Sequence, residues 1–163
     1  MEREFLEIIK NNQGIIHKVC NVYCDDQDDR DDLFQEIVAQ LWKSFPSFRK
    51  ESKFSTWMYR VALNTAITSF KKTKRRPDQS RLTYDNFQIK DVNYDTETED
   101  NIKQLHRAVA QLTGIEKSII LLYLEDKKYE EIAEITGITQ NYVRVKMNRI
   151  KKKLKKFMES AGE

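Results

Sequence analysis

Long stretches of the chain contain neither glycine nor proline, and this scarcity limits what the chain can fold into. The sequence has 163 residues, of which four are glycine and two are proline. A β protein of this length needs many turns, and turns draw heavily on these two residues. Helix interiors exclude them because both destabilise a helix. We therefore predict an all-α fold.

Apolar residues recur at helical spacing in three N-terminal segments, over residues 5–23, 33–45 and 54–76. The first segment contains Gly14, which is a weak point in the helix. Together the three helices are expected to form one small bundle, which we assign to residues 1–76.

A second set of helices begins at Ile102 and ends with a long helix from Thr139. Residues 77–100 lack helical periodicity and are predicted to be a flexible acidic linker, in which weak alternation at 82–92 is compatible with a short strand. The predicted architecture is two small helical bundles joined by this linker, the second bundle spanning residues 101–163.

Charge is distributed in blocks along the chain, although the net charge is only +3. Residues 53–76 contain seven basic and no acidic residues, and residues 139–158 contain eight basic and no acidic residues. Residues 77–100, between them, contain two basic and seven acidic residues. This pattern indicates two separate contacts with a polyanion, joined by a segment that repels polyanions.

Six aspartates stand between positions 25 and 32 in the sequence CDDQDDRDDLFQE. A calcium-binding EF-hand loop from position 25 would place Asp29 and Glu36 correctly, but its sixth position requires glycine and holds Arg30. Carboxylates at a helix start accept hydrogen bonds from unpaired amides and favour the positive end of the helix dipole. We therefore interpret Asp29, Asp31 and Asp32 as residues just before or inside the first turn of the next helix.

Other signs of a metal site, an enzyme or a membrane segment are weak. His17, Cys20 and Cys24 provide three of the four ligands that a zinc site needs, at a spacing that fits no zinc pattern, so the cysteines are interpreted as core residues. A metal nuclease using the aspartates is disfavoured because they are sequential and no His or Lys completes a site. The charged N-terminus does not resemble a signal peptide, and the longest apolar run, residues 119–124, is too short to span a membrane. We expect no catalytic activity, no cofactor, no metal and a cytoplasmic location.

Three motifs resemble parts of the sigma factors of bacterial RNA polymerase. The sequence DDLFQEIVAQLW at residues 31–42 is similar to the segment that docks on the polymerase clamp helices. Residues 48–76, which contain F-x-x-W-x-x-x-x-A-x-N, resemble the promoter-melting segment, and residues 129–154 resemble the C-terminal helix-turn-helix. With only a linker between them, the chain resembles the two-domain extracytoplasmic-function (ECF) subfamily over residues 1–76 and 101–158.

The resemblance implies roles for residues in the first bundle. The docking residues it implies are Asp32, Gln35, Glu36, Leu41 and Trp42. Aromatic and basic residues alternate in the third helix, a pattern that suits unpaired bases and their phosphates, although Trp57 and Val61 share the apolar face and are interpreted as core. The residues expected at the −10 element are Arg49, Lys50, Ser52, Lys53, Arg60, Asn64, Lys71 and Lys72.

Local signals in the last two helices fit the helix-turn-helix that the resemblance implies. Gly137 offers a left-handed end to the first helix, and Thr139 is a good N-cap for the second. Lys128 stands where the family has a small hydroxyl cap, so Asp126 is the candidate cap for the first helix. Lysines at 151–156 are either phosphate contacts or a solvated tail. The residues expected at the −35 element are Thr139, Gln140, Asn141, Arg144, Val145, Lys146 and Asn148.

These observations predict a sigma factor that binds core RNA polymerase, directs it to promoter DNA and promotes opening of the duplex. The resemblance adds an inhibitory anti-sigma factor as a further partner. The alternative is a stand-alone helix-turn-helix regulator whose N-terminal half binds a dimer partner or a ligand.

Overall fold

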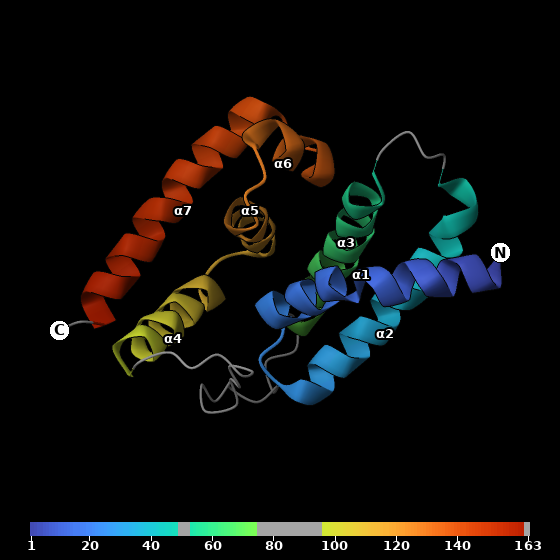
Figure 1. Cartoon of the computed structure of the whole chain (residues 1–163). Coiled ribbons are helices and arrows are strands. Elements are labelled where there is room, and N and C mark those ends of the chain that lie inside the picture. Colours follow the sequence, from blue (N-terminus) through green and yellow to red (C-terminus); the bar gives the residue numbers. More distant parts are fainter. Residues whose placement is uncertain (49–52, 75–95, 162–163) are drawn as a thin grey trace. The chain divides into compact units, whose positions relative to one another are not determined.

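The computed structural model describes residues 1–48, 53–74 and 96–161, and all regular structure in these ranges is helical (Figure 1). The chain divides into two compact units, Met1–Arg81 and Leu82–Glu163. This confirms the predicted all-α fold. The short strand considered at residues 82–92 lies outside the described residues.

The first unit is a bundle of α1 (Glu2–Tyr23), α2 (Gln27–Ser44) and α3 (Phe54–Lys74), with the short 3₁₀ helix η1 (Phe45–Ser47) after α2. Each of the three α-helices packs against the other two, since each carries one apolar stripe that only a neighbour can cover. The centre of this core is formed by Ile16, Val19, Ile37, Leu41, Met58, Ala62 and Ala66, all fully buried.

The irregular point of α1 is Asn12, not Gly14 as the sequence suggested. Asn12 has φ −125° and ψ 16°, outside the helical range. Its side-chain Nδ2 donates to the carbonyl of Ile8 at 2.9 Å. That carbonyl is the one that the backbone N–H of Asn12 would use in a regular helix, so the side chain competes with the helix at this turn.

Helix α2 begins six residues before Leu33, where its apolar pattern starts. The N-cap is Asp26, whose Oδ1 accepts a hydrogen bond from the backbone N–H of Asp28 at 2.8 Å. The prediction that Asp31 and Asp32 lie at or before the first turn is therefore wrong, because the helix opens with a polar turn that apolar periodicity does not reveal. Asp29 does lie in the first turn.

The second unit consists of α4 (Thr96–Ala110), α5 (Gly114–Leu124), α6 (Tyr129–Thr136) and α7 (Gln140–Ala161). Helix α7 packs against each of the other three. In Figure 1, α6 lies at the N-terminal end of α7 and α4 near its C-terminal end. The apolar stripe of α7 that these helices cover is formed by the fully buried Val143, Met147 and Ile150.

Helix α4 starts at Thr96, five residues before the expected start of the second bundle. Its first turn contains Glu97 and Glu99, which were assigned to the acidic linker. Carboxylates are favourable there because the N-terminus of a helix carries partial positive charge. Part of the acidic stretch is thus the start of a helix.

The turn between α6 and α7 has the predicted chemistry. Gly137 adopts the left-handed conformation with φ 78°, and Thr139 Oγ1 accepts a hydrogen bond from the backbone N–H of Tyr142 at 3.1 Å. The predicted cap of α6 is wrong. Its N-cap is Lys128, without a side-chain hydrogen bond, whereas Asp126 has φ 62° and belongs to the turn that leaves α5.

The capping assignment predicts that Asp26→Ala destabilises the first unit by about 1 kcal/mol, the usual cost of losing an N-cap oxygen. Both tryptophans of the chain, Trp42 and Trp57, lie in this unit, so tryptophan fluorescence during urea denaturation reports on it alone. The matched control is Asp32→Ala, which removes an exposed carboxylate beyond the first turn and should change the free energy of unfolding by less than about 0.5 kcal/mol. Equal losses for the two variants would contradict the assignment.

Candidate polymerase and nucleic-acid interfaces

The residues expected to dock on polymerase divide between a surface and the core. Asp32, Gln35 and Glu36 are exposed on α2, and Trp42 keeps 43% of its surface exposed. These four residues form what we call the docking surface. Leu41 does not belong to it, since it is fully buried. The reason is helical spacing: Leu41 follows Leu33 and Ile37 at intervals of four, on the stripe that faces the bundle.

Trp42 packs against another aromatic side chain. The centroid of its ring lies 4.9 Å from that of Phe5 on α1, and Phe5 in turn lies 5.4 Å from Phe45 of η1. A large side chain that is packed on one edge and open on the other loses little conformational freedom when a partner covers it. Trp42 is therefore suited to act as an anchor for a protein partner.

Asp29, in the aspartate cluster next to the docking surface, has neighbouring carboxylates that favour its protonated form. The pKa of Asp29 is raised by burial and, after that, by the neighbouring carboxylates of Asp26 and Asp32. The Arg30 side chain is turned to the backbone, where its Nε donates to the carbonyl of Cys24 at 3.1 Å. The segment that an EF-hand would use as a loop is helical from Gln27 onward, so the geometry of a calcium loop is not formed.

The cysteines of α1 and the nearby histidine do not form a metal centre. Burial raises the pKa of both Cys20 and Cys24 to about 12, which keeps the thiols protonated and weak as ligands. The ring of His17 stacks on that of Phe34, with centroids 4.8 Å apart. Within residues 1–48, 53–74 and 96–161 no three His, Cys, Asp or Glu side chains are grouped as metal ligands.

Arg60, Asn64 and Lys71 form one row along α3, and Lys53 lies immediately before the helix. The three helical residues are separated by four and seven positions, which at about 100° per residue keeps them within about 40° of one another. Lys53, Asn64 and Lys71 are exposed and Arg60 is half-buried. We call these four residues the α3 row; it combines three cations with one carboxamide, as a path for phosphates and a base would require.

Lys72, which was also expected at the −10 element, does not join the α3 row. Lys72 is turned by about 100° from Lys71. Arg49, Lys50 and Ser52 lie outside the described residues. Trp57 is buried, as its core interpretation predicted, and Val61 is half-buried.

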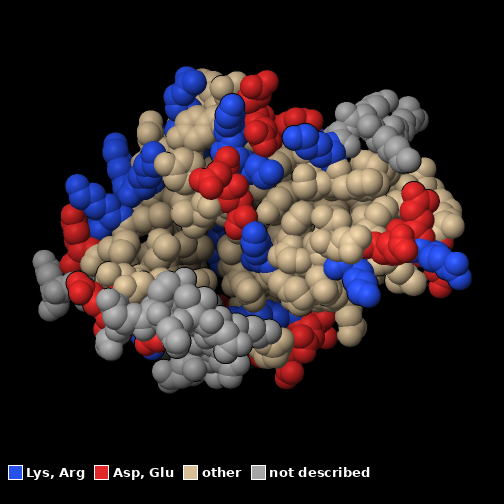
Figure 2. Space-filling model, in the orientation of Figure 1, with Lys and Arg blue, Asp and Glu red and all other residues tan. Residues whose placement is uncertain are grey.

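The N-terminal turns of α7 present a second polar surface. At about 100° per residue, its members span about 140° of the helix, centred between Arg144 and Asn148, on the part of α7 that the buried stripe leaves exposed. This recognition surface consists of the exposed residues Gln140, Asn141, Arg144, Val145 and Asn148. Figure 2 shows Lys and Arg side chains gathered along the edge of the second unit that α7 forms.

Lys146 does not share the recognition surface, in contrast to the prediction. It is turned by about 200° from Arg144, and its Nζ lies 5.5 Å from the centroid of the Tyr142 ring. Thr139 is exposed, and its hydroxyl oxygen is engaged by the backbone of Tyr142. Its role in the structure is that of an N-cap.

Family comparisons decide what these surfaces belong to. Residues 8–76 match the model of sigma-70 region 2, and residues 102–154 match that of sigma-70 region 4. The chain is 31% identical over 144 residues to the RNA polymerase sigma factor SigV of Bacillus subtilis, which covers 86% of this chain and 82% of SigV. It is 32% identical over 134 residues to the ECF RNA polymerase sigma-E factor of Haemophilus influenzae, covering 76% of this chain and 71% of that protein.

The chain belongs to the ECF family of sigma factors. A sigma factor directs RNA polymerase to promoters, and this class of initiation factor is not enzymatic. The match of residues 8–76 to region 2 argues against the alternative of a stand-alone regulator. In that alternative the N-terminal half would bind a dimer partner or a ligand. No helix in the described ranges of this sigma factor combines the length and hydropathy of a membrane span.

Solved sigma-factor structures share the fold. The sigma factor RpoE from Bartonella quintana, crystallised with the anti-sigma factor NepR, superposes with a TM-score of 0.71 at 16% identity, covering 97% of this chain and 96% of RpoE. CnrH, in complex with the cytosolic domain of CnrY, superposes with a TM-score of 0.69 at 14% identity, covering 98% and 90% of the two chains.

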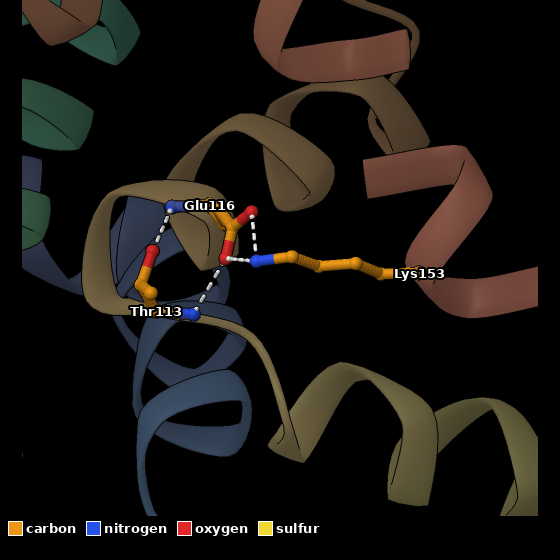
Figure 3. Close-up of polar contacts among 3 residues, drawn as sticks. All are labelled: Thr113, Glu116 and Lys153. Carbon is orange, nitrogen blue, oxygen red and sulfur yellow. Dashed lines mark hydrogen bonds and ion pairs between the residues drawn. The ribbon is translucent and has the colours of Figure 1, made fainter. Parts of the chain in front are cut away.

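A polar network in region 4 of this sigma factor escaped the sequence analysis. Glu116 Oε1 accepts a hydrogen bond from the backbone N–H of Thr113 at 2.9 Å, and the Glu116 N–H donates to Thr113 Oγ1 at 3.4 Å. This is a capping box at the start of α5. The sequence T-G-I-E carries its signature, an S/T-x-x-E pattern before an apolar run. Lys153 of α7 completes the network, at 2.9 and 2.8 Å from the two carboxylate oxygens (Figure 3).

The charge of Glu116 is maintained by its partners. Burial alone would raise the pKa of this carboxyl, but the hydrogen bonds from Lys153 and Thr113 outweigh that effect, so the pKa is lowered. A lowered pKa in the folded state means that the network stabilises the protein at neutral pH and that this stabilisation is lost as the pH falls through the lowered value. The network is thus formed under the conditions in which a sigma factor works.

Proposed function

We propose that each unit of this ECF sigma factor uses one exposed helix surface for promoter recognition and that α2 supplies the contact with polymerase. The docking surface binds core RNA polymerase, the α3 row holds the −10 element as it opens, and the recognition surface of α7 reads the −35 element. In this proposal residues 1–76 act as region 2, residues 77–100 as an acidic connection and residues 101–163 as region 4. The observation that carries it is the α3 row, in which cations that can hold a phosphate path lie beside an exposed carboxamide that can pair with an unstacked base.

The proposed role of the α3 row is capture, with no covalent chemistry. A carboxamide can pair with the edge of a base once that base has left the stack. Unpairing costs free energy, and Asn64 offsets part of it only if the contact forms in the open state and not in the closed one. The basic members Lys53, Arg60 and Lys71 would hold the phosphates on either side of such a base. Arg49, Lys50 and Ser52 extend the same role by resemblance.

Region 4 is proposed to read duplex DNA. A recognition helix contacts base edges in the major groove through its N-terminal turns. Arg144 can bind a guanine through two hydrogen bonds, and Gln140 or Asn141 can bind an adenine in the same way. Lys152 and Lys155 follow on the same side of α7 and would contact phosphates.

An anti-sigma factor is the third proposed partner. Of the two solved structures with this fold, one contains the sigma factor RpoE bound to the anti-sigma factor NepR and the other contains CnrH bound to the cytosolic domain of CnrY. By analogy with them, we propose that this sigma factor acts in the cytoplasm and is held inactive by a protein inhibitor. Co-purification of the chain from its native host, followed by mass spectrometry, identifies the inhibitor.

The experiment that tests the proposed function is transcription of genomic DNA by core polymerase with and without this protein, followed by sequencing of transcript 5′ ends. We expect start sites that depend on the protein and share two upstream elements. Transcripts that start at the same sites with and without the protein would refute the proposal.

The docking surface predicts that Gln35→Ala combined with Glu36→Lys abolishes binding to core polymerase and leaves the fold intact. Both side chains are exposed beyond the first turn of α2, so folding does not need them. The measurements are a pull-down with core enzyme and a circular dichroism spectrum. The matched control is Gln13→Ala with Glu7→Lys, two exposed positions on α1. Loss of helical content together with binding would show that the residues serve the fold.

The recognition surface predicts that Arg144→Ala weakens binding to the −35 element in a base-specific way, by about 1–3 kcal/mol if its contact is bidentate. Lys152→Ala should instead weaken binding to every duplex alike and reduce the slope of log K against log salt by about 1. Binding is measured for the mapped promoter and for a scrambled duplex over a series of salt concentrations. If the two variants affect both duplexes equally, the recognition surface is misassigned.

The α3 row predicts that Asn64→Ala severely reduces transcription from a closed linear promoter and that part of the defect disappears on a template with a mismatched −10 region. The mismatched template needs no opening, so only loss of the base contact remains. Abortive transcripts are measured on both templates at one salt concentration, with Asn21→Ala, an exposed asparagine of α1, as the matched control. An equal defect on both templates would mean that Asn64 does not assist opening.

A further inference from the structure

The lysines in the second half of α7 do not all face the same way. Five lysines lie between positions 151 and 156. Arg144 and Lys153 are nine positions apart, two and a half turns, so they lie on opposite sides of the helix. Lys152 and Lys155, in contrast, fall within about 80° of Arg144. Lys153 therefore points away from the DNA that the recognition surface would contact.

Lys153 has a partner in another helix. Its Nζ donates to both carboxylate oxygens of Glu116, at 2.9 and 2.8 Å, across 37 positions in sequence (Figure 3). The side chain of Glu116 is 2% exposed and that of Lys153 is 53% exposed. The carboxylate is fixed in place by the capping box with Thr113, so the ammonium group reaches a preset position at the start of α5.

The pair adds something that the apolar stripe of α7 cannot. Val143, Met147 and Ile150 bury α7 against its neighbours, but apolar contacts have no direction and tolerate small rolls and slides of a helix. Two charge-assisted hydrogen bonds fix direction and register. An orientation of α7 that withdraws Lys153 leaves the buried Glu116 carboxylate without its charged partner, so such orientations are disfavoured.

We propose that Lys153 and Glu116 are positioning residues for promoter recognition: their ion pair sets the orientation in which α7 presents the recognition surface. The inference rests on the proposed role of α7 at the −35 element. The axial distance between Lys153 and Arg144 is about 14 Å, so a rotation of about 5° at the ion pair displaces Arg144 by about 1 Å. A displacement of that size breaks the geometry of a bidentate contact with a base.

The test uses the complex with core polymerase and two duplexes, the promoter mapped from transcript 5′ ends and the same promoter with its upstream element scrambled. Lys153→Met should reduce the preference for the intact element about tenfold without changing the salt slope. Lys153→Arg should retain the preference, because a guanidinium keeps the charge and the paired donors. Glu116→Gln keeps an acceptor for Thr113 but loses the charge. As a single substitution it should reduce the preference for the intact element, and in the double variant with Lys153→Met it should cause no further reduction.

The matched control is Lys152→Met, on the same helix but on the side of Arg144. It should weaken binding to both duplexes alike and lower the salt slope by about 1. Circular dichroism at the assay temperature establishes whether each variant is folded. If Lys153→Met is not folded, the test relies on Glu116→Gln.

Two results would overturn the inference. If Lys153→Met behaves like Lys152→Met, Lys153 is a phosphate contact. If the preference is unchanged in folded Lys153→Met and Glu116→Gln, the pair only stabilises region 4. A wild-type protein without preference for the intact element would instead refute the proposed role of α7, so the two failures are distinguishable.

Discussion

Every surface described above depends on the burial of one apolar stripe per helix. Because a helix is cylindrical, fixing one side against neighbours also fixes which residues lie on the other side. In α2 the buried stripe is Leu33, Ile37 and Leu41, and in α7 it is Val143, Met147 and Ile150. The docking surface lies on the side of α2 opposite its stripe, and the recognition surface lies on the part of α7 that its stripe leaves exposed. The hydrophobic core thus positions residues that bind DNA or protein without touching either.

The residues of the aspartate cluster have different roles. Asp26 caps α2, and Asp31 accepts a hydrogen bond from the Gln27 side chain at 2.8 Å. Asp32 points outward beside Gln35 and Glu36. Burial and, after it, the neighbouring carboxylates raise the pKa of Asp29, so holding this group charged carries an electrostatic cost in the isolated protein. A basic partner at the docking surface would relieve that cost, which gives the negative charge a use beyond capping.

The basic residues of α7 in region 4 fall into two groups. The exposed cations of α7 face outward, where they can meet phosphates, while Lys153 turns inward to a carboxylate that belongs to a helix cap. Surface ion pairs contribute little to stability on average. The Glu116 side chain is almost fully buried, so this pair differs from that average and links the start of α5 to the second half of α7.

The sequence by itself determined the all-α fold, the order of the helices, the turn at Gly137 and Thr139 and the family. These features depend on local spacing: apolar residues at three and four positions, a glycine that tolerates positive φ, and a hydroxyl that can cap the next helix. Much of the candidate site followed from the same motifs, including Gln35, Glu36, Asn64 and Arg144. Helix starts were less accurate, because polar first turns such as those of α2 and α4 carry no apolar signal.

Helical spacing alone separates Leu41, Lys72 and Lys146 from the surfaces on which they were expected. Only the tertiary structure decided which residues of different helices meet: it packed Trp42 of α2 against Phe5 of α1 and paired Lys153 of α7 with Glu116 of α5. The physical reason is that a contact between residues 37 positions apart depends on how two helices pack, and packing is set by all the side chains between them at once. A motif records the type of each residue, whereas the direction of its side chain is fixed when its helix meets its neighbours.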